Sequence, residues 1–116
     1  MSQLPNCLFC RIVTGEIPGQ IVHKDDQLTA FRDINPAAPT HILIVPNQHI
    51  GGVSEIGPGD AATLAALLLR AKEIARQENL GAGYRLVINQ GPDGGQTVFH
   101  LHVHLLGGRP MTWPPG

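Results

Sequence analysis

Apolar residues recur along this chain in two patterns, one typical of strands and one typical of helices. Five short apolar runs, most of them rich in β-branched residues, predict strands over 21–23, 28–31, 41–45, 84–89 and 99–106. A longer segment, 58–79, places leucine and alanine at helical spacing. It predicts an amphipathic helix that begins near Pro58 and stops at Gly81.

A second, shorter helix is expected over 6–14, with Asn6 as its N-cap and Gly15 as its C-cap. The strands mostly follow one another along the chain, and the polar residues 24–27 between the first two predict a hairpin. These elements predict an α+β fold: a five-stranded antiparallel sheet with one long and one short helix. No linker or internal repeat interrupts the pattern, so residues 1–116 are expected to form a single domain.

Composition narrows the class of protein. With 116 residues, 42% of them hydrophobic and 15% charged, the chain is expected to be globular with one modest core. Its formal net charge of −1 gives no broad affinity for nucleic acid. The sequence has neither a signal-peptide pattern nor an apolar stretch of the ~20 residues that a membrane span needs. We therefore expect a cytoplasmic protein with no nucleic-acid or membrane partner.

Three of the six histidines, His100, His102 and His104, alternate with apolar residues in the last predicted strand. Since alternate side chains of a strand point the same way, the three imidazoles would share one exposed face over roughly 13 Å, and Leu101 and Val103 would face the core. Two kinds of chemistry suit this arrangement. One is metal ligation, for which His-x-His is a common spacing. The other is nucleophilic or acid–base chemistry, since imidazole works near neutral pH.

A glycine-rich segment, 89–97, comes immediately before these histidines and supplies three glycines, amide side chains and a hydroxyl. On its own, such a segment would be interpreted as an ordinary hairpin loop. Beside three imidazoles, backbone N–H groups that an anion can approach closely favour a phosphate site.

The two cysteines, Cys7 and Cys10, form a Cys-x-x-Cys pair. A disulfide scaffold would need more cysteines. A redox pair of the thioredoxin type lacks the βαβ pattern that surrounds such motifs. Two interpretations stay open: half of a zinc site completed by histidines elsewhere, and two small apolar residues at the start of a helix.

The segment His100–Leu106 resembles the defining motif of the histidine-triad nucleotide-binding proteins, and the resemblance covers essentially the whole chain. Further segments resemble the Hint branch of that family, in the same order: Phe31–Ile34, Pro39–His41, Asn89, Gly94–Gln96, Gly107–Pro110 and Trp113–Gly116. So many dispersed matches are far more specific than an isolated His-x-His.

The resemblance implies a homodimer whose two five-stranded sheets join into one continuous sheet. It also implies an enzyme, a phosphoramidase that hydrolyses purine nucleotides such as adenosine monophosphate joined to an amine. His102 would be the nucleophile, His104 would contact phosphate, and His41 would support the triad from a neighbouring strand. Thr97, a position that is often serine in the family, could help deliver a proton to the leaving amine.

The resemblance also assigns nucleotide-binding positions around His102. Asp33 would bind the ribose hydroxyls, and Trp113 would reach across the dimer and select substrates at the partner's site. The other positions would form the purine pocket (Ile17, Phe31 and Ile34) or contact phosphate (Asn89, Gly95, Gln96, Thr97 and His104).

Cys7, Cys10, His49 and His100 match the set seen in zinc-bearing members of the family. Two thiolates and two imidazoles make a closed tetrahedral site, so a bound zinc would be structural and would tie the first helix to the sheet. The alternative is that the cysteines pack as small apolar residues and that His49 simply ends a strand. No catalytic metal is expected, because no Mg²⁺-ligand cluster is apparent.

Three other functions stay open. A dinucleoside polyphosphate hydrolase is the activity of another triad branch, although the ending Trp113–Gly116 favours phosphoramidate hydrolysis. A nucleotide-binding regulatory module would keep purine binding and tolerate the loss of His102. A metallohydrolase built on the three histidines lacks a neighbouring carboxylate as general base, since Asp93 is only a loop candidate.

Overall fold

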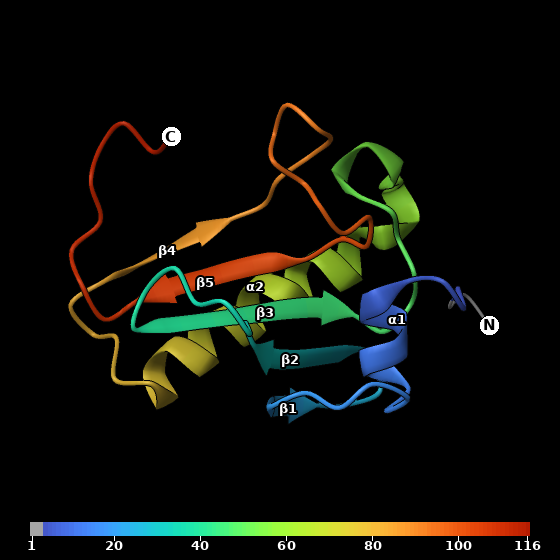
Figure 1. The fold of residues 1–116 in the computed structure, drawn as a ribbon, viewed down its shortest axis with the longest axis horizontal. Helices are drawn as coiled ribbons and strands as arrows, with labels where there is room; N and C mark the ends of the chain where they lie inside the picture. The colour runs from blue at the N-terminus through green and yellow to red at the C-terminus, as the bar shows by residue number, and fades with distance from the viewer. Residues whose placement is uncertain (1–3) are drawn as a thin grey trace.

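A five-stranded sheet forms the centre of the structure, a computed structural model that describes residues 4–116 (Figure 1). The strands are antiparallel throughout and lie in the order β1-β2-β3-β5-β4. The elements are α1 (Leu8–Val13), β1 (Ile21–Lys24), β2 (Leu28–Arg32), β3 (Thr40–Pro46), α2 (Ala61–Gln77), β4 (Tyr84–Val87) and β5 (Val103–Gly107). The predicted α+β fold, with one long and one short helix on an antiparallel sheet, is confirmed.

The two helices pack on opposite faces of the sheet (Figure 1). Because side chains alternate along a strand, β3 contributes to the apolar clusters on both faces. Ile42 and Ile44 pack with α2, whereas Leu43 and Val45 pack with α1, and none of the four is more than 5% exposed. A strand buried on both faces accounts for the uninterrupted apolar run that predicted it.

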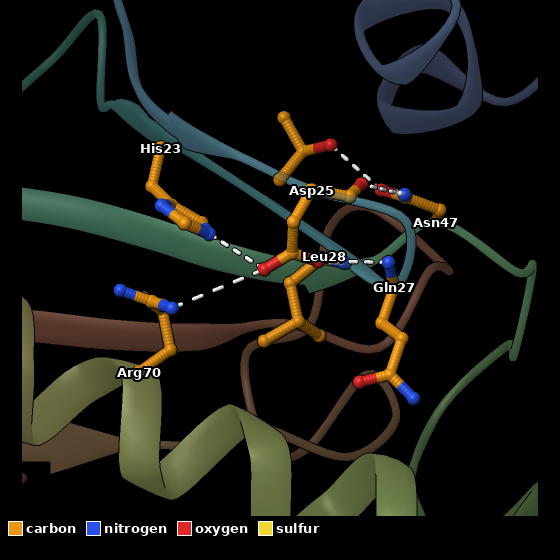
Figure 2. A network of polar contacts seen from close by, with 7 residues as sticks. His23, Asp25, Gln27, Leu28, Asn47 and Arg70 are labelled. Atoms are coloured by element: carbon orange, nitrogen blue, oxygen red, sulfur yellow. Dashed lines mark hydrogen bonds and ion pairs between the residues drawn. The ribbon is translucent and has the colours of Figure 1, made fainter.

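The predicted hairpin of β1 and β2 is confirmed, and the side chain of Asp25 organises it (Figure 2). Oδ1 of Asp25 accepts the backbone N–H groups of Gln27 and Leu28, both at 2.8 Å, which closes the turn. Oδ2 lies 2.6 Å from Nε2 of His23 and 4.0 Å from the guanidinium of Arg70 on α2. The hydrogen bond from His23 is the main cause that lowers the pKa of Asp25 to about 2. The network therefore ties the hairpin to α2.

Helix α1 is shorter than expected, and its N-cap is Cys7 rather than Asn6. Sγ of Cys7 accepts the backbone N–H of Cys10 at 3.3 Å, so the thiol takes the place of the amide oxygen that the sequence suggested. Thr14 is the C-cap, and Gly15 follows it with φ of +85°, the left-handed conformation that glycine adopts without strain.

Helix α2 begins and ends inside its predicted range of 58–79. A 3-10 turn over Pro58–Asp60 precedes it. At the other end, Asn79 adopts φ of +61° and donates its N–H to Arg76, while the N–H of Leu80 reaches back to Ala75. This pair of bonds closes the helix before Gly81, so the prediction that Gly81 stops it was wrong.

Strand β5 is also shorter than the predicted 99–106, and β4 ends before residue 89. Instead of pairing in the ladder, the segment ahead of β5 is tied to the last residue of β3 and to the chain that follows it. The N–H of Leu101 donates to the carbonyl of Ile50 at 2.6 Å, and Nε2 of His100 donates to the carbonyl of Pro46 at 2.8 Å. Only His104 of the three histidines therefore lies in a strand.

Within residues 4–116, the structure contains no helix that is long and apolar enough to cross a membrane.

Candidate active site and metal cluster

The three histidines lie on the α1 face of the sheet. Side chains keep alternating through residues 100–105, although only the end of this segment is a strand. The leucine and valine side chains enter the core against α2, and the imidazoles point the other way. His100 and His102 are 0% and 7% exposed, so the expectation of an exposed row of imidazoles was wrong. Phe9 of α1 packs against both rings, with centroids 6.1 and 5.0 Å away.

The ring of His102 is held in one tautomer. Its Nδ1 lies 2.6 Å from the backbone carbonyl of His100, which can only accept, so Nδ1 carries the proton. In the neutral ring, Nε2 therefore has a free lone pair. A fixed neutral imidazole with a free nitrogen is what a nucleophile requires.

His41 and His104 form a second hydrogen-bonded unit with a defined direction. The backbone N–H of Ala37 donates to Nδ1 of His41 at 3.0 Å, so the neutral His41 ring carries its proton on Nε2. That Nε2 lies 2.9 Å from Nδ1 of His104 and donates to it. His104 consequently carries its own proton on Nε2, which makes this atom a donor for an oxygen of a bound substrate.

Burial keeps these rings neutral. Desolvation is the main cause that lowers the pKa values of His41 and His102 below 6.5, against the opposing effect of the Asp33 charge. For His104, desolvation together with the neighbouring His102 and His41 lowers the pKa to about 4. At neutral pH, the site therefore presents one imidazole lone pair and one imidazole N–H.

Asp33 follows β2 directly and lies beside this unit. Its Oδ2 is 3.5 Å from Nε2 of His41, and its Oδ1 accepts the N–H of Asn35 at 2.8 Å. The backbone N–H of Asp33 donates to the carbonyl of His41 at 2.9 Å. The position predicted for ribose binding is thus half-buried and held at the edge of the histidine site.

The residues expected to form the purine pocket do not all lie together. Phe31 is buried in the apolar cluster on the α1 face, and Ile17 packs against that cluster. Ile34, in contrast, is 92% exposed. Ile34 therefore belongs to an exposed loop rather than to a formed pocket wall.

The glycine-rich loop is fastened to the rest of the protein by Gln96. This side chain is 5% exposed, donates to the carbonyls of Gly51 and Val98, and accepts the N–H of Gly91. The side chain of Gln96 would therefore have to break some of these hydrogen bonds to contact phosphate. The N–H of Gly95 likewise donates within the loop, to Pro92 at 3.0 Å.

The other predicted contacts around the loop are more accessible. Thr97 is exposed, and Asn89 is half-buried just beyond β4. Trp113 is 81% exposed, with the guanidinium of Arg85 6.0 Å from its ring centre. Arg85 also donates to the carbonyl of Thr112 at 2.8 Å, which holds the tail near β4.

Cys7, Cys10, His49 and His100 come together as the sequence predicts, and their four ligand atoms lie within 4.8 Å of one another. Nδ1 of His100 is 3.3 Å from Sγ of Cys7 and 3.5 Å from Sγ of Cys10, and Nδ1 of His49 is 3.3 Å from Sγ of Cys10. Tetrahedral zinc, with typical Zn–S and Zn–N bonds, separates S and N by about 3.5 Å. The donor set and its spacing fit zinc.

The hydrogen bond from His100 to Pro46 supports the same conclusion. It places the proton of the ring on Nε2 and leaves the Nδ1 lone pair facing the two sulfurs. Metal-binding histidines are usually held in this way, by a second bond from the nitrogen that does not bind the metal. Burial raises the pKa of Cys10, and a bound cation would favour its thiolate.

Asp33, His41 and His104 form a second group whose ligand atoms lie within 4.8 Å. Ala37 already occupies the Nδ1 lone pair of His41, so the nitrogen that faces the group carries the proton. A metal at that nitrogen would leave the ring with no proton at all or break the bond from Ala37. This group fits a hydrogen-bond chain better than a metal, which weighs against a metallohydrolase built on it.

Sequence reasoning missed three contributors: the ring of Phe9, the N–H of Ala37 and the carbonyl of Pro46. Two of them act through the backbone, for which the residue type carries no signal. Phe9 did carry a signal, because it is the aromatic residue between the two cysteines on the buried face of the first helix.

Comparison with known proteins gives consistent matches along the chain. A family model described as the HIT domain matches residues 14–111. The chain is 52% identical over 111 residues to a 14 kDa zinc-binding protein of Zea mays, covering 94% of this chain and 87% of that protein. It is 49% identical to a protein of Arabidopsis thaliana named adenylylsulfatase HINT1, covering 94% of this chain and 76% of that protein. The crystal structure of a HIT family hydrolase from Legionella pneumophila matches with a TM-score of 0.95 and 54% identity, over 96% of this chain and 100% of that one.

Proposed function

This chain belongs to the HIT domain family and is a homologue of HIT-family hydrolases, and we propose that it is a purine nucleoside phosphoramidase. Its reaction would be hydrolysis of the P–N bond between a purine nucleoside monophosphate and an amine. The observation that carries the proposal is the bond from Nδ1 of His102 to the carbonyl of His100, which leaves Nε2 of His102 free to attack phosphorus.

In the first step, the lone pair of Nε2 of His102 forms a bond to phosphorus, and the P–N bond to the amine breaks. The leaving nitrogen keeps that electron pair and takes a proton through the hydroxyl of Thr97, which is exposed and is re-protonated from solvent. The Nε2–H of His104 donates to a phosphoryl oxygen, where negative charge concentrates.

In the second step, an oxygen of water bonds to phosphorus and the bond from phosphorus to His102 breaks. The water proton returns to solvent, and Nε2 of His102 recovers its lone pair. One water is consumed, and the products are a nucleoside monophosphate and a free amine. Splitting the reaction through a nucleotidyl-histidine replaces one difficult displacement with two easier ones.

The nucleotide would bind across the α1 face, with its ribose hydroxyls on Asp33 and its base against Phe31 and Ile17. Ile34 would close over the base, since burial of its exposed side chain is favourable. The amide of Asn89 and the loop at Gly95 and Gln96 would approach the phosphate.

We also propose a homodimer in which the β4 strands of two copies pair. β4 lies at one edge of the sheet, and unpaired strand edges are natural places for a second chain to add. The tail with Trp113 lies near the same edge and would thereby reach the partner's site.

A structural zinc in the cluster of Cys7, Cys10, His49 and His100 is part of the proposal. The fit of the donor atoms and the zinc-binding relative support it. We expect protein purified without added metal to contain about one zinc ion per chain.

A second substrate deserves a direct comparison, because one relative is named an adenylylsulfatase. In adenylyl sulfate, the group that leaves phosphorus would be sulfate instead of an amine. Attack by His102 would be the same, but sulfate needs no proton from Thr97. Comparing the two substrates therefore distinguishes the role of His102 in attack from the role of Thr97 in protonating the leaving group.

The first experiment measures release of adenosine monophosphate from an amine-linked phosphoramidate, with wild type and His102→Ala compared without added metal. The substitution should lower kcat by roughly 10⁴-fold and leave nucleotide binding within a few-fold. Mass spectrometry of acid-quenched wild type should find the nucleotidyl group on a peptide that contains His102.

His23→Ala is the matched histidine control and should keep wild-type turnover. Undiminished turnover by His102→Ala would reject the mechanism. Binding without turnover of the phosphoramidate, adenylyl sulfate or a dinucleoside polyphosphate would favour a regulatory module.

A further inference from the structure

His100 belongs to two structures at once. Its ring lies in the metal cluster, with Nδ1 facing the sulfurs of Cys7 and Cys10 at 3.3 and 3.5 Å. Its backbone carbonyl accepts the Nδ1–H of His102 at 2.6 Å. A displacement of the ring of His100 would therefore also move the group that fixes the tautomer of the nucleophile.

Phe9 makes a second connection between the same two places. It lies between Cys7 and Cys10 on α1, and its ring meets that of His102 edge to face, with centroids 5.0 Å apart and planes at 89°. The ring of Phe9 also contacts the ring of Phe31, with centroids 5.3 Å apart. One wall around His102 is thus supplied by a residue that lies between two of the cluster residues in the sequence.

Helix α1 depends on outside contacts for its position. It has six residues, too few to be stable as an isolated helix in water. Its N-cap, Cys7, is itself one of the cluster residues. A metal bound by Cys7 and Cys10 would therefore fix both the start of α1 and the location of Phe9.

We propose that the metal cluster positions the catalytic nucleophile: through the carbonyl of His100 and the ring of Phe9, occupancy of the cluster holds His102 in its reactive tautomer and orientation. His100 and Phe9 are positioning residues, and neither needs to touch substrate. The inference rests on the proposed function of His102 as nucleophile, but the coupling itself is visible without turnover.

The expected effect falls on kcat rather than on KM. His100, one of the cluster residues, is hydrogen-bonded to His102 through its backbone carbonyl. The proposed ribose contact, Asp33, lies on a different loop, after β2. Misplacing a reacting group by about 1 Å costs on the order of 100-fold in rate. Loss of the metal should therefore lower kcat by about 10- to 100-fold and leave KM within about twofold.

The test compares wild type as purified, wild type stripped with a chelator, and stripped protein reloaded with Zn²⁺ alone. Metal content, kcat and KM are measured for each, together with the ¹⁵N–¹H spectrum of the His102 imidazole. Metal-loaded protein should show a single Nδ1–H tautomer, stripped protein should show averaging of the two nitrogens, and reloading should restore the first spectrum. A stripped protein that keeps both the single tautomer and wild-type kcat would overturn the proposal.

Variants separate coupling from general instability. His49→Gln removes a ligand that has no ring contact with His102, and it should reproduce the stripped protein. Phe9→Leu should keep the metal, lower kcat and broaden the His102 signals. Ile12→Val weakens packing on the same buried face of α1 and changes none of the four cluster residues, and it should keep the metal, the tautomer and kcat. An equal loss of kcat in Ile12→Val and His49→Gln would assign the effect to destabilisation of α1 and reject the coupling.

Failure of the proposed function is distinguishable from failure of this inference. If metal-loaded wild type releases no nucleotide from any substrate, the function is wrong. The imidazole spectrum still decides the coupling in that case, because a tautomer that changes with metal supports it and an unchanged tautomer rejects it.

Discussion

Nε2 of His41 donates a hydrogen bond to Nδ1 of His104 across 2.9 Å, and this bond decides which nitrogen of His104 carries a proton. The direction is set one step further back, by the backbone N–H of Ala37 on the other nitrogen of His41. Through these two bonds, the backbone N–H of Ala37 fixes the proton of His104 on Nε2, the atom that we propose donates to the substrate.

His41→Ala should lower kcat because His104 loses the donor that fixes its tautomer. We expect a decrease of roughly 10- to 100-fold, smaller than the effect of losing the nucleophile. His41→Gln, which can still donate from its amide, should recover part of the rate. Equal and full activity in both variants would show that the bond has no role in turnover.

The rate should decrease on the acidic side only below pH 6.5. Attack needs neutral His102, and burial lowers the pKa of His102 below that value. The charge of Asp33 opposes this shift, so Asp33→Asn should move the acidic limb of the kcat profile to still lower pH. Profiles of kcat for wild type and Asp33→Asn check the prediction, and an unchanged limb in the variant contradicts it.

Acid should destabilise the metal-free protein between pH 6.5 and about 4. Burial lowers the pKa values of His100 and His104 to about 4 in the folded protein, whereas unfolded histidines titrate near 6.5. In this window, the unfolded state binds more protons, so the free energy of unfolding decreases as pH falls. Urea titrations at pH 7 and pH 5 measure it, and His104→Gln should show a smaller decrease.

Gly94→Ala should destabilise the protein by about 1–3 kcal/mol, because an added methyl group would lie 2.4 Å from the backbone carbonyl oxygen of Gln90. Gly57→Ala is the control, since its methyl group would meet nothing within 4 Å and its φ of −120° suits alanine. Thermal unfolding of the two variants gives the comparison. Equal stability would mean that the loop adjusts without cost.

Substitutions at Thr97 should separate substrates by their leaving groups. Thr97→Ala removes the proposed proton relay and should slow amine release by roughly 10- to 100-fold, while adenylyl sulfate should be affected little. Thr97→Ser keeps the hydroxyl and should preserve both reactions. The ratio of the two rates in each variant is the measurement, and parallel losses on both substrates would argue against the relay.

The five strands and the two-faced burial of β3 could be predicted from the sequence, because they depend on hydrophobic periodicity. The position of β5 between β3 and β4 could not, because periodicity does not say which strands pair. The limits of β5 could not, since the bonds of His100 and Leu101 to a distant segment override the strand pattern. Helix α2 likewise ends at Gln77 and not at Gly81, because the N–H groups of Glu78, Asn79 and Leu80 already satisfy its last carbonyls.

The metal cluster was predictable as a set of residues, and its geometry fits that prediction. The burial of His100 and His102 was not, because the strand pattern alone says nothing of the helix that covers them. Gln96 illustrates a further limit: its position suggests contact with phosphate, whereas its side chain is used to hold the loop to Gly51.

The alternation of imidazole and apolar side chains over residues 100–105 also limits how this segment can change over evolutionary time. Point substitutions alter one face at a time. A single inserted or deleted residue would instead exchange the two faces, turning imidazoles toward α2 and apolar side chains toward α1. We therefore expect homologous sequences to vary in length elsewhere, as in the turns, and to keep a constant number of residues between the first histidine and the end of β5.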